Sequence, residues 1–143
     1  MARFLLRYLL PLSFGSLLYA LCRSSTLLYE RIFYLFIGTS WFSLKRSLNY
    51  SCRSLFADDF AYKLAVYSLP NALWHISFCY LLSYGITTFW GTKRIVWRFR
   101  LLLFFFAAFA PDVLQYLGLI PGTFDAFDIL LTSFASVFVW MTT

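Results

Sequence analysis

The stretch from Leu101 to Asp128 reads LLLFFFAAFAPDVLQYLGLIPGTFDAFD and contains the features that decide the fold. An uninterrupted apolar run leads into Asp112, and two further carboxylates, Asp125 and Asp128, follow a Pro-Gly dipeptide. Charged groups are costly in hydrocarbon and are tolerated mainly where they face a protein interior, a wet cavity or one another. The stretch therefore predicts two apolar helices joined by a tight turn, with acidic residues gathered near that turn.

The composition of the whole chain indicates an integral membrane protein. Of its 143 residues, 62% are hydrophobic and 13% are charged, whereas a soluble domain carries about a quarter charged residues. The net charge of +6 comes from basic residues beside apolar runs, where anionic lipid and the positive bias of cytoplasmic loops account for them. We therefore expect the lipid bilayer as the main partner and no binding to nucleic acid.

Four apolar segments predict an all-α membrane protein with about four transmembrane helices in a single domain, residues 1–143. The predicted spans are residues 4–21, 66–86, 97–117 and 124–141, each close to the ~20 residues that a bilayer requires. Pro11 is expected to kink the first span or to lie where a neighbour satisfies the freed carbonyl. Pro70 is expected to start or to break a helix.

The long connection at residues 23–62 is expected to be a loop with an interfacial or re-entrant segment. Residues 27–42 are apolar and aromatic but are interrupted by Glu30 and Arg31, which leaves them too short for a span. Residues 43–59 read as a polar loop with room for an amphipathic turn. Whether residues 27–42 span, re-enter or lie at the interface is left open by the sequence.

The basic connection at residues 91–100 determines the predicted orientation. It carries Lys93, Arg94, Arg98 and Arg100, so the positive-inside rule puts it on the cytoplasmic side. With four spans, both termini are then cytoplasmic, and the first loop and the turn at residues 118–123 face outward. The basic residues of the first loop argue against this orientation, but a five-span alternative would move the 91–100 connection outside.

The cysteines and the single histidine predict no metal ion or cofactor. Cys22, Cys52 and Cys79 are odd in number and lack CxxC spacing, so neither a disulfide framework nor a metal site is expected. We interpret them as small buried thiols. His75 alone cannot build a zinc site, which needs four ligands.

The acidic residues near the predicted turn are the main candidate binding site. Asp112 and Gln115 are three residues apart, as are Asp125 and Asp128, so each pair shares one helical face and the two pairs can converge. Such a group suits a cation, a proton or a polar headgroup. A structural interpretation stays open as well: Asp125 as a helix cap, Asp128 as a first-turn acid favoured by the helix dipole, and Asp112 paired with a loop arginine such as Arg31 or Arg53.

The second predicted span offers possible partners for these carboxylates. Asn71, His75 and Cys79 recur every four residues, so they share a face that also includes Trp74. Such a polar line usually faces other helices rather than lipid. A structural interpretation explains the same pattern. In it, His75 makes ordinary hydrogen bonds within the protein, and Asn71 and Trp74 hold helices together.

The motif D-x-x-Q followed by P-G-T-F-D-x-x-D resembles the VanZ-like family of small bacterial membrane proteins. It falls on residues 112–115 and 121–128, and the four-span layout with a long first loop is similar too. The family more often has glutamate at the position of Asp112, and Asn71 and Trp74 stand where it often has Lys-x-x-His. The resemblance implies an inner-membrane location and a cell-envelope or antibiotic-resistance context.

Three functions fit these observations. The first is a non-enzymatic VanZ-like protein whose periplasm-facing acidic pocket binds a polar lipid headgroup, a cation or a glycopeptide-related ligand. The second is an accessory subunit of a larger inner-membrane or secretion assembly, with other membrane proteins as partners. The third is a membrane enzyme acting on a lipid or cell-wall precursor, which ranks last because no nucleophile accompanies the carboxylates.

Overall fold

The computed structural model describes residues 5–23, 35–36, 38–56, 58–91, 94–119 and 126–143, and these ranges are helical apart from short turns. The elements in chain order are η1 (Leu5–Leu9), α2 (Leu10–Cys22), α4 (Ser40–Ser54), α5 (Asp59–Lys63), η2 (Leu64–Ser68), α6 (Leu69–Trp90), α7 (Arg94–Tyr116) and α8 (Ala126–Thr142). The all-α class is therefore confirmed for the described ranges. Most of the segment 27–42 lies outside them.

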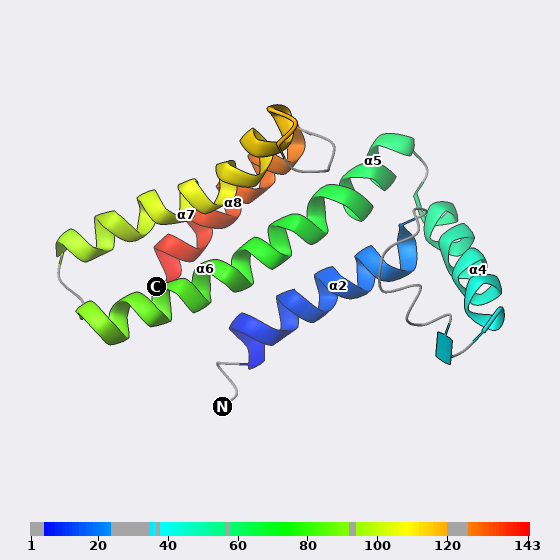
Figure 1. Cartoon of the computed structure of the whole chain (residues 1–143), viewed down its shortest axis with the longest axis horizontal. Helices are drawn as coiled ribbons and strands as arrows, with labels where there is room; N and C mark the ends of the chain where they lie inside the picture. The colour runs from blue at the N-terminus through cyan, green and yellow to red at the C-terminus, as the bar shows by residue number, and fades with distance from the viewer. Residues whose placement is uncertain (1–4, 24–34, 37, 57, 92–93, 120–125) are drawn as a thin grey trace.

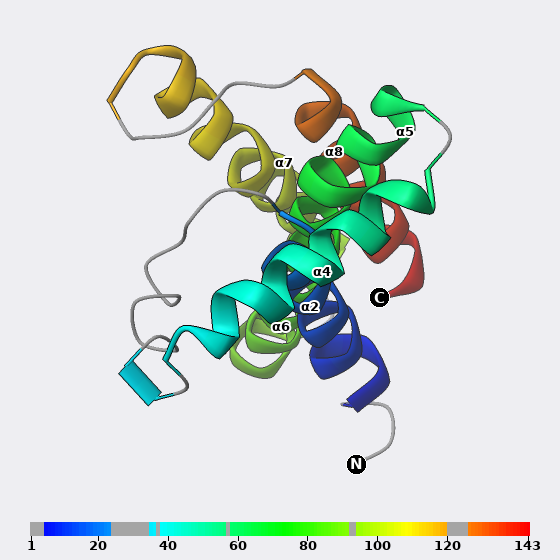
Figure 2. The same cartoon turned by 90° about the vertical axis from the view of Figure 1, so that its right-hand side faces the viewer.

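The long helices α2, α6, α7 and α8 lie side by side, with α6 at the centre (Figure 1). α6 packs against α2 and against α8, and α7 packs mainly against α8. α4 lies across one end of this bundle, as Figure 2 shows from that end. At the other end, Tyr8 contacts the ring of Tyr80, and the Tyr80 hydroxyl lies 2.8 Å from that of Thr142.

Apolar helices in the described part of the chain differ in how well they could cross a membrane. Val96–Tyr116 is both long and apolar enough to do so, whereas Leu6–Cys22 and Ala126–Thr142 are apolar but shorter. Large apolar side chains are exposed on the outer faces of the bundle, Leu102, Phe106 and Phe134 among them. By length and composition, one helix of the described residues could cross a membrane. That it does so, and that the other three predicted spans do, belongs to the proposal below.

Wide helical turns precede two of the prolines. η1 comes directly before the Leu10-Pro11 step and η2 before the Leu69-Pro70 step. Because proline has no N–H to donate, the preceding turn rearranges; at the end of η2 the Leu69 N–H donates to the carbonyl of Leu64, five residues back. α5, η2 and α6 therefore form one unbroken helix that extends beyond the predicted 66–86. Pro70 lies in the first turn of α6, where a helix start was predicted, but helical backbone also precedes it, so the alternative that Pro70 breaks a helix is wrong.

The predicted polar loop at residues 43–59 is also wrong, because α4 occupies most of it. Trp41 and Lys45 are buried and Cys52 is half-buried, so residues at helical spacing form one face that packs toward α2. The outer face carries serine and basic residues together with the exposed side chains of Phe42, Leu44 and Tyr50. The interpretation as a loop gave too much weight to those polar residues and too little to the spacing of the buried ones.

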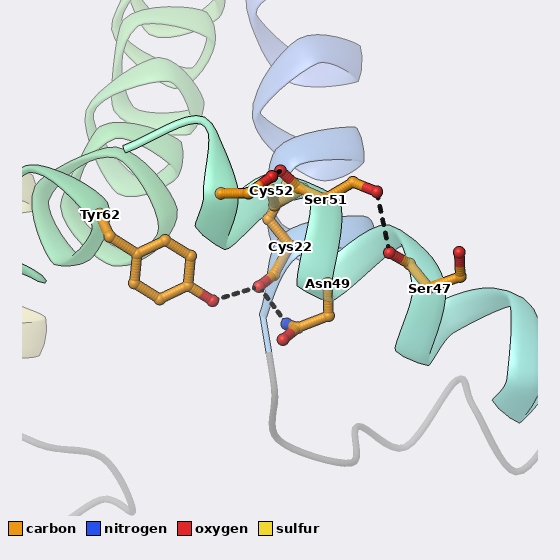
Figure 3. The surroundings of a disulfide bond; sticks show 7 residues. Cys22, Ser47, Asn49, Ser51, Cys52 and Tyr62 are labelled. Carbon is orange, nitrogen blue, oxygen red and sulfur yellow. Dashed lines mark hydrogen bonds between the residues drawn. A yellow bond between two sulfur atoms is a disulfide. The ribbon is translucent and has the colours of Figure 1, made fainter. Parts of the chain in front are cut away.

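Cys22 and Cys52 form a disulfide bond, which corrects the prediction of three free thiols. The bond joins the last residue of α2 to α4, and two further interactions converge there (Figure 3). The carbonyl of Cys22 accepts hydrogen bonds from the Tyr62 hydroxyl at 2.7 Å and from the Asn49 amide. Burial at this junction raises the pKa of Tyr62. The third cysteine, Cys79, is free and buried as predicted.

The three helices α6, α7 and α8 meet in a tightly packed cluster at the level of Tyr80. Phe104, Val139 and Cys79 are completely buried there, and Tyr80 is nearly so. About one helical turn further along this end, Arg100 is buried and donates a hydrogen bond to the hydroxyl of Ser83 at 2.7 Å. We call this part of the three-helix unit the closed end.

Candidate functional site

A cavity of about 370 Å³ lies beyond the closed end, between α6, α7 and α8. We call this part of the unit the open end. Six of the seven candidate residues line the cavity: Asn71, Trp74, His75, Asp112, Gln115 and Asp128. The seventh, Asp125, lies outside the described residues. The structure thus brings residues far apart in sequence into one site, and their role in binding stays a prediction.

Each of the three helices contributes one face to the cavity. On α7 the lining residues run from Ala107 to Gln115 at spacings of three and four, and on α8 they are Asp128 and Thr132. Residues at this spacing lie above one another on a helix. The cavity therefore follows the helix axes and is bounded by turns of regular helix.

The cavity exists because α7 changes abruptly from large to small side chains. Phe104 fills the space between the helices at the closed end, whereas Ala107 and Ala108 face the cavity one turn later. Five further residues line the cavity and were not predicted from the sequence: Phe78, Ala107, Ala108, Pro111 and Thr132. The step from FFF to AA at residues 104–108 is the signal that could have revealed the alanines.

Asn71 and Asp128 form a direct contact across the helix interface. The Asn71 side-chain amide donates a hydrogen bond of 2.9 Å to the Asp128 carboxylate. Asp128 is 8% exposed and Asp112 is 7% exposed, and a buried carboxylate is tolerated only where hydrogen bonds or a partner compensate for its lost hydration. The amide from α6 supplies part of that compensation.

His75 is held by a hydrogen bond to α8. Its Nε2 lies 2.8 Å from the hydroxyl of Ser136, which itself donates to the carbonyl of Thr132. Because the Ser136 proton is engaged, we assign the hydrogen to His75 Nε2, which leaves Nδ1 as an acceptor. The hydrogen bond at Nε2 favours the interpretation of His75 as a residue that holds two helices together. The ring of His75 also lines the cavity.

Trp74 is fixed from the opposite side by α2. Its Nε1 donates to the Ser16 hydroxyl at 3.2 Å, and its ring lies 5.1 Å from that of Tyr19. Gly15 permits this approach, since a Cβ there would lie 3.1 Å from the Trp74 ring. Trp74 therefore joins two helices as well as lining the cavity.

A second group of acidic residues beside α5 differs from the cavity. Asp59 lies 3.0 Å from the Lys63 ammonium and 3.5 Å from the Arg53 guanidinium, and all three side chains are exposed. The hydrogen bond from Lys63 and then its positive charge lower the pKa of Asp59. These are surface ion pairs of the kind that contribute little to stability. Arg53, one predicted partner of Asp112, is thus engaged with Asp59.

Neither a set of metal-binding side chains nor a similar protein indicates which ligand the cavity binds. Among the residues that the structure describes, no three His, Cys, Asp or Glu side chains are arranged to hold a metal ion. Comparisons with family models, curated proteins and solved structures find no match to this chain. The resemblance to VanZ-like proteins therefore rests on the sequence motif and the predicted four-span layout.

Proposed function

We propose that this chain is a VanZ-like protein of the bacterial inner membrane that binds a polar ligand in its open end without converting it. It would cross the bilayer about four times, through η1 and α2, η2 and α6, α7, and α8. The ligand classes are a polar lipid headgroup, a cation or a glycopeptide-related molecule. The observation that carries the proposal is the cavity lined by six candidate residues from three helices.

The disulfide supports an orientation with the open end toward the periplasm. Disulfides form in oxidising compartments and are rare in the cytosol. The Cys22–Cys52 bond lies near α5, and Phe60 of α5 packs 5.1 Å from Phe127 at the start of α8, next to Asp128. The disulfide and the carboxylates therefore belong to the same end of the bundle.

Binding fits the lining better than catalysis does. Thr132 supplies the hydroxyl among the lining residues, and that hydroxyl donates to the main-chain carbonyl of Asp128 at 2.7 Å. A nucleophilic hydroxyl needs a base to accept its proton, and here a carbonyl holds it instead. A role as an enzyme on lipid or cell-wall precursors is accordingly the least supported proposal.

The exposed apolar faces support a second candidate, an accessory subunit of a larger membrane assembly. Phe106 is 71% exposed and Phe134 is 66% exposed. Lipid or the helices of partner proteins can cover such faces, so purification must distinguish the two. A stoichiometric protein partner with an empty cavity would favour the subunit.

The test compares bound molecules in wild type and two double variants purified in mild detergent. Asp112→Asn/Asp128→Asn alters the cavity, while Asp58→Asn/Asp59→Asn removes the same charge from the exposed acidic group. Native mass spectrometry should detect a bound small molecule in wild type and in the surface variant. The cavity variant should lose it about tenfold or more, since hydrogen bonds to charged groups contribute about 1.5–3 kcal/mol. Equal retention by the cavity variant would refute a binding role.

A further inference from the structure

Arg100 of α7 carries a positive charge into the interior of the closed end. Its side chain is 5% exposed, and no ion pair joins it to any of the described residues. The four described carboxylates belong to α5 and its N-cap or to the open end: Asp58, Asp59, Asp112 and Asp128. A buried charge without a counter-charge is costly in free energy. An anion that binds at Arg100 would remove that cost.

The guanidinium of Arg100 has one edge that is hydrogen-bonded and one edge that is not. Nη1 donates to the Ser83 hydroxyl at 2.7 Å. Nε and Nη2 donate to no residue in the described part of the chain, and of the two only Nε is fully enclosed. The N–H groups of Nε and Nη2 are parallel, and such a fork matches two oxygens of a phosphate or a carboxylate. The unpaired edge is therefore suited to bidentate binding of an anion that approaches from Nη2.

The position of Arg100 along α7 suits an anion at the membrane surface. Arg100 lies six residues, roughly 9 Å, from the start of α7 at Arg94. Helical side chains lean toward the N-terminus of their helix, and on α7 that direction leads out of the bundle at the closed end. Long basic side chains near the end of a membrane helix reach the headgroup layer in this way.

Tryptophans at the same end indicate where the headgroup layer would lie. Trp97 stacks on Trp140 with ring centroids 4.0 Å apart, and the Trp140 indole donates to the main-chain carbonyl of Trp97 at 3.3 Å. Trp90, the last residue of α6, is 61% exposed. Tryptophan is enriched at membrane–water interfaces, so Arg100 would lie about one turn inside the interface. The anions found at that depth are the phosphates of lipid headgroups.

We infer that the closed end binds the phosphate group of a phospholipid of the cytoplasmic leaflet at Arg100, between α6 and α7. Ser83 holds the guanidinium at Nη1 and leaves its other edge for the phosphate oxygens. This inference takes its membrane orientation from the proposed function. It makes no use of the cavity, which lies on the other side of Phe104 along α7.

The test measures lipid binding by the full chain in mild detergent. Native mass spectrometry counts bound dioleoylphosphatidylglycerol, with dioleoylglycerol as the comparison that lacks the phosphate, and the melting temperature is followed as each lipid is added. Arg100→Met replaces the buried charge by an apolar side chain, a change that often leaves a fold as stable as before. Arg98→Met is the matched control, because it removes the same charge from an exposed position on the same helix.

Wild type and Arg98→Met should bind phosphatidylglycerol with similar affinity and about tenfold more tightly than dioleoylglycerol. Arg100→Met should lose that tenfold preference, and its melting temperature should no longer rise with phosphatidylglycerol. The cavity variant Asp112→Asn/Asp128→Asn should bind phosphatidylglycerol as wild type does. A failure of the open-end proposal would therefore be distinguishable from a failure at the closed end.

Phosphatidylglycerol binding by Arg100→Met equal to that of wild type would overturn the inference, and Arg100 would then only tie α7 to Ser83 of α6. Should Arg100→Met fail to fold, Arg100→Lys replaces it, since lysine keeps the charge but lacks the fork; weaker binding supports the inference and unchanged binding overturns it. A protein partner held through Arg100 in place of lipid would also overturn it. If inorganic phosphate stabilises the chain through Arg100 and phosphatidylglycerol does not, the phosphate site stands and lipid as its source is refuted.

Discussion

The closed and open ends of the α6–α7–α8 unit are built from the same three helices but are packed in opposite ways. At the closed end the ring of Phe104 is completely buried against Cys79 and Val139. At the open end Ala107 and Ala108 leave a cavity with two buried carboxylates on its wall. The comparison shows that a change of side-chain volume within one turn of α7 is enough to separate the core from the candidate site. The backbone need not change, because α7 is helical through both.

The largest expected effect comes from making the closed end resemble the open end. Phe104→Ala removes a fully buried ring and should lower the free energy of unfolding by about 3–5 kcal/mol, because a cavity replaces packed atoms. Leu102→Ala is the control, since Leu102 is 68% exposed on the same helix. Denaturant unfolding in detergent measures both. Similar losses for the two variants would show that the closed end is not the stabilising core.

A somewhat smaller effect should follow from removing the covalent link near the open end. Cys22→Ser breaks the bond that spans 30 residues of sequence and should lower the free energy of unfolding by about 2–4 kcal/mol, mainly through the entropy of the unfolded chain. Reduction of the wild type should give the same loss, and reductant should leave the variant unchanged. If reductant did not change the free energy of unfolding of the wild type, a stabilising disulfide between Cys22 and Cys52 would be refuted.

The smallest expected effect concerns pH and the exposed carboxylate beside α5. Lys63 lowers the pKa of Asp59 below its ordinary value of 3.8. A lowered folded-state pKa means that the stabilisation is fully present above the ordinary value and is lost as pH falls through the lowered one. As pH falls from about 4 through the lowered pKa, the melting temperature should therefore drop slightly more in wild type than in Asp59→Asn. An identical pH response in both proteins would show that Asp59 does not contribute to the pH dependence of the melting temperature.

Hydropathy and motif spacing predicted the helical bundle because burial in lipid or core imposes long apolar runs. Helix α7 could be predicted from its apolar run, and the shared faces of Asp112 with Gln115 and of Asn71 with His75 from residue spacing. The sequence also indicated that α6 would direct polar groups toward other helices. Asn71 and His75 make such contacts, with Asp128 and Ser136.

The disulfide, α4 and the cavity itself were not predicted, and each depends on a tertiary contact. Cys22 and Cys52 are remote in sequence and follow no motif, so only the packing of α4 on α2 brings their sulfurs together. The volume of the cavity depends on what α6 and α8 place opposite Ala107 and Ala108. A single sequence records which side chains are small, but not whether a neighbour fills the space.

The unbroken helix from Asp59 to Trp90 is roughly 48 Å long at 1.5 Å per residue, whereas the hydrocarbon core measures ~30 Å. In the proposed orientation its first turns must therefore stand in the headgroup layer or above it. α4 then lies beside α5 at the level of the membrane surface, and the disulfide ties α4 to the end of α2 (Figure 1). A chain with little soluble mass would thereby offer the periplasm a rigid epitope, within reach of proteases and antibodies that cannot cross the bilayer.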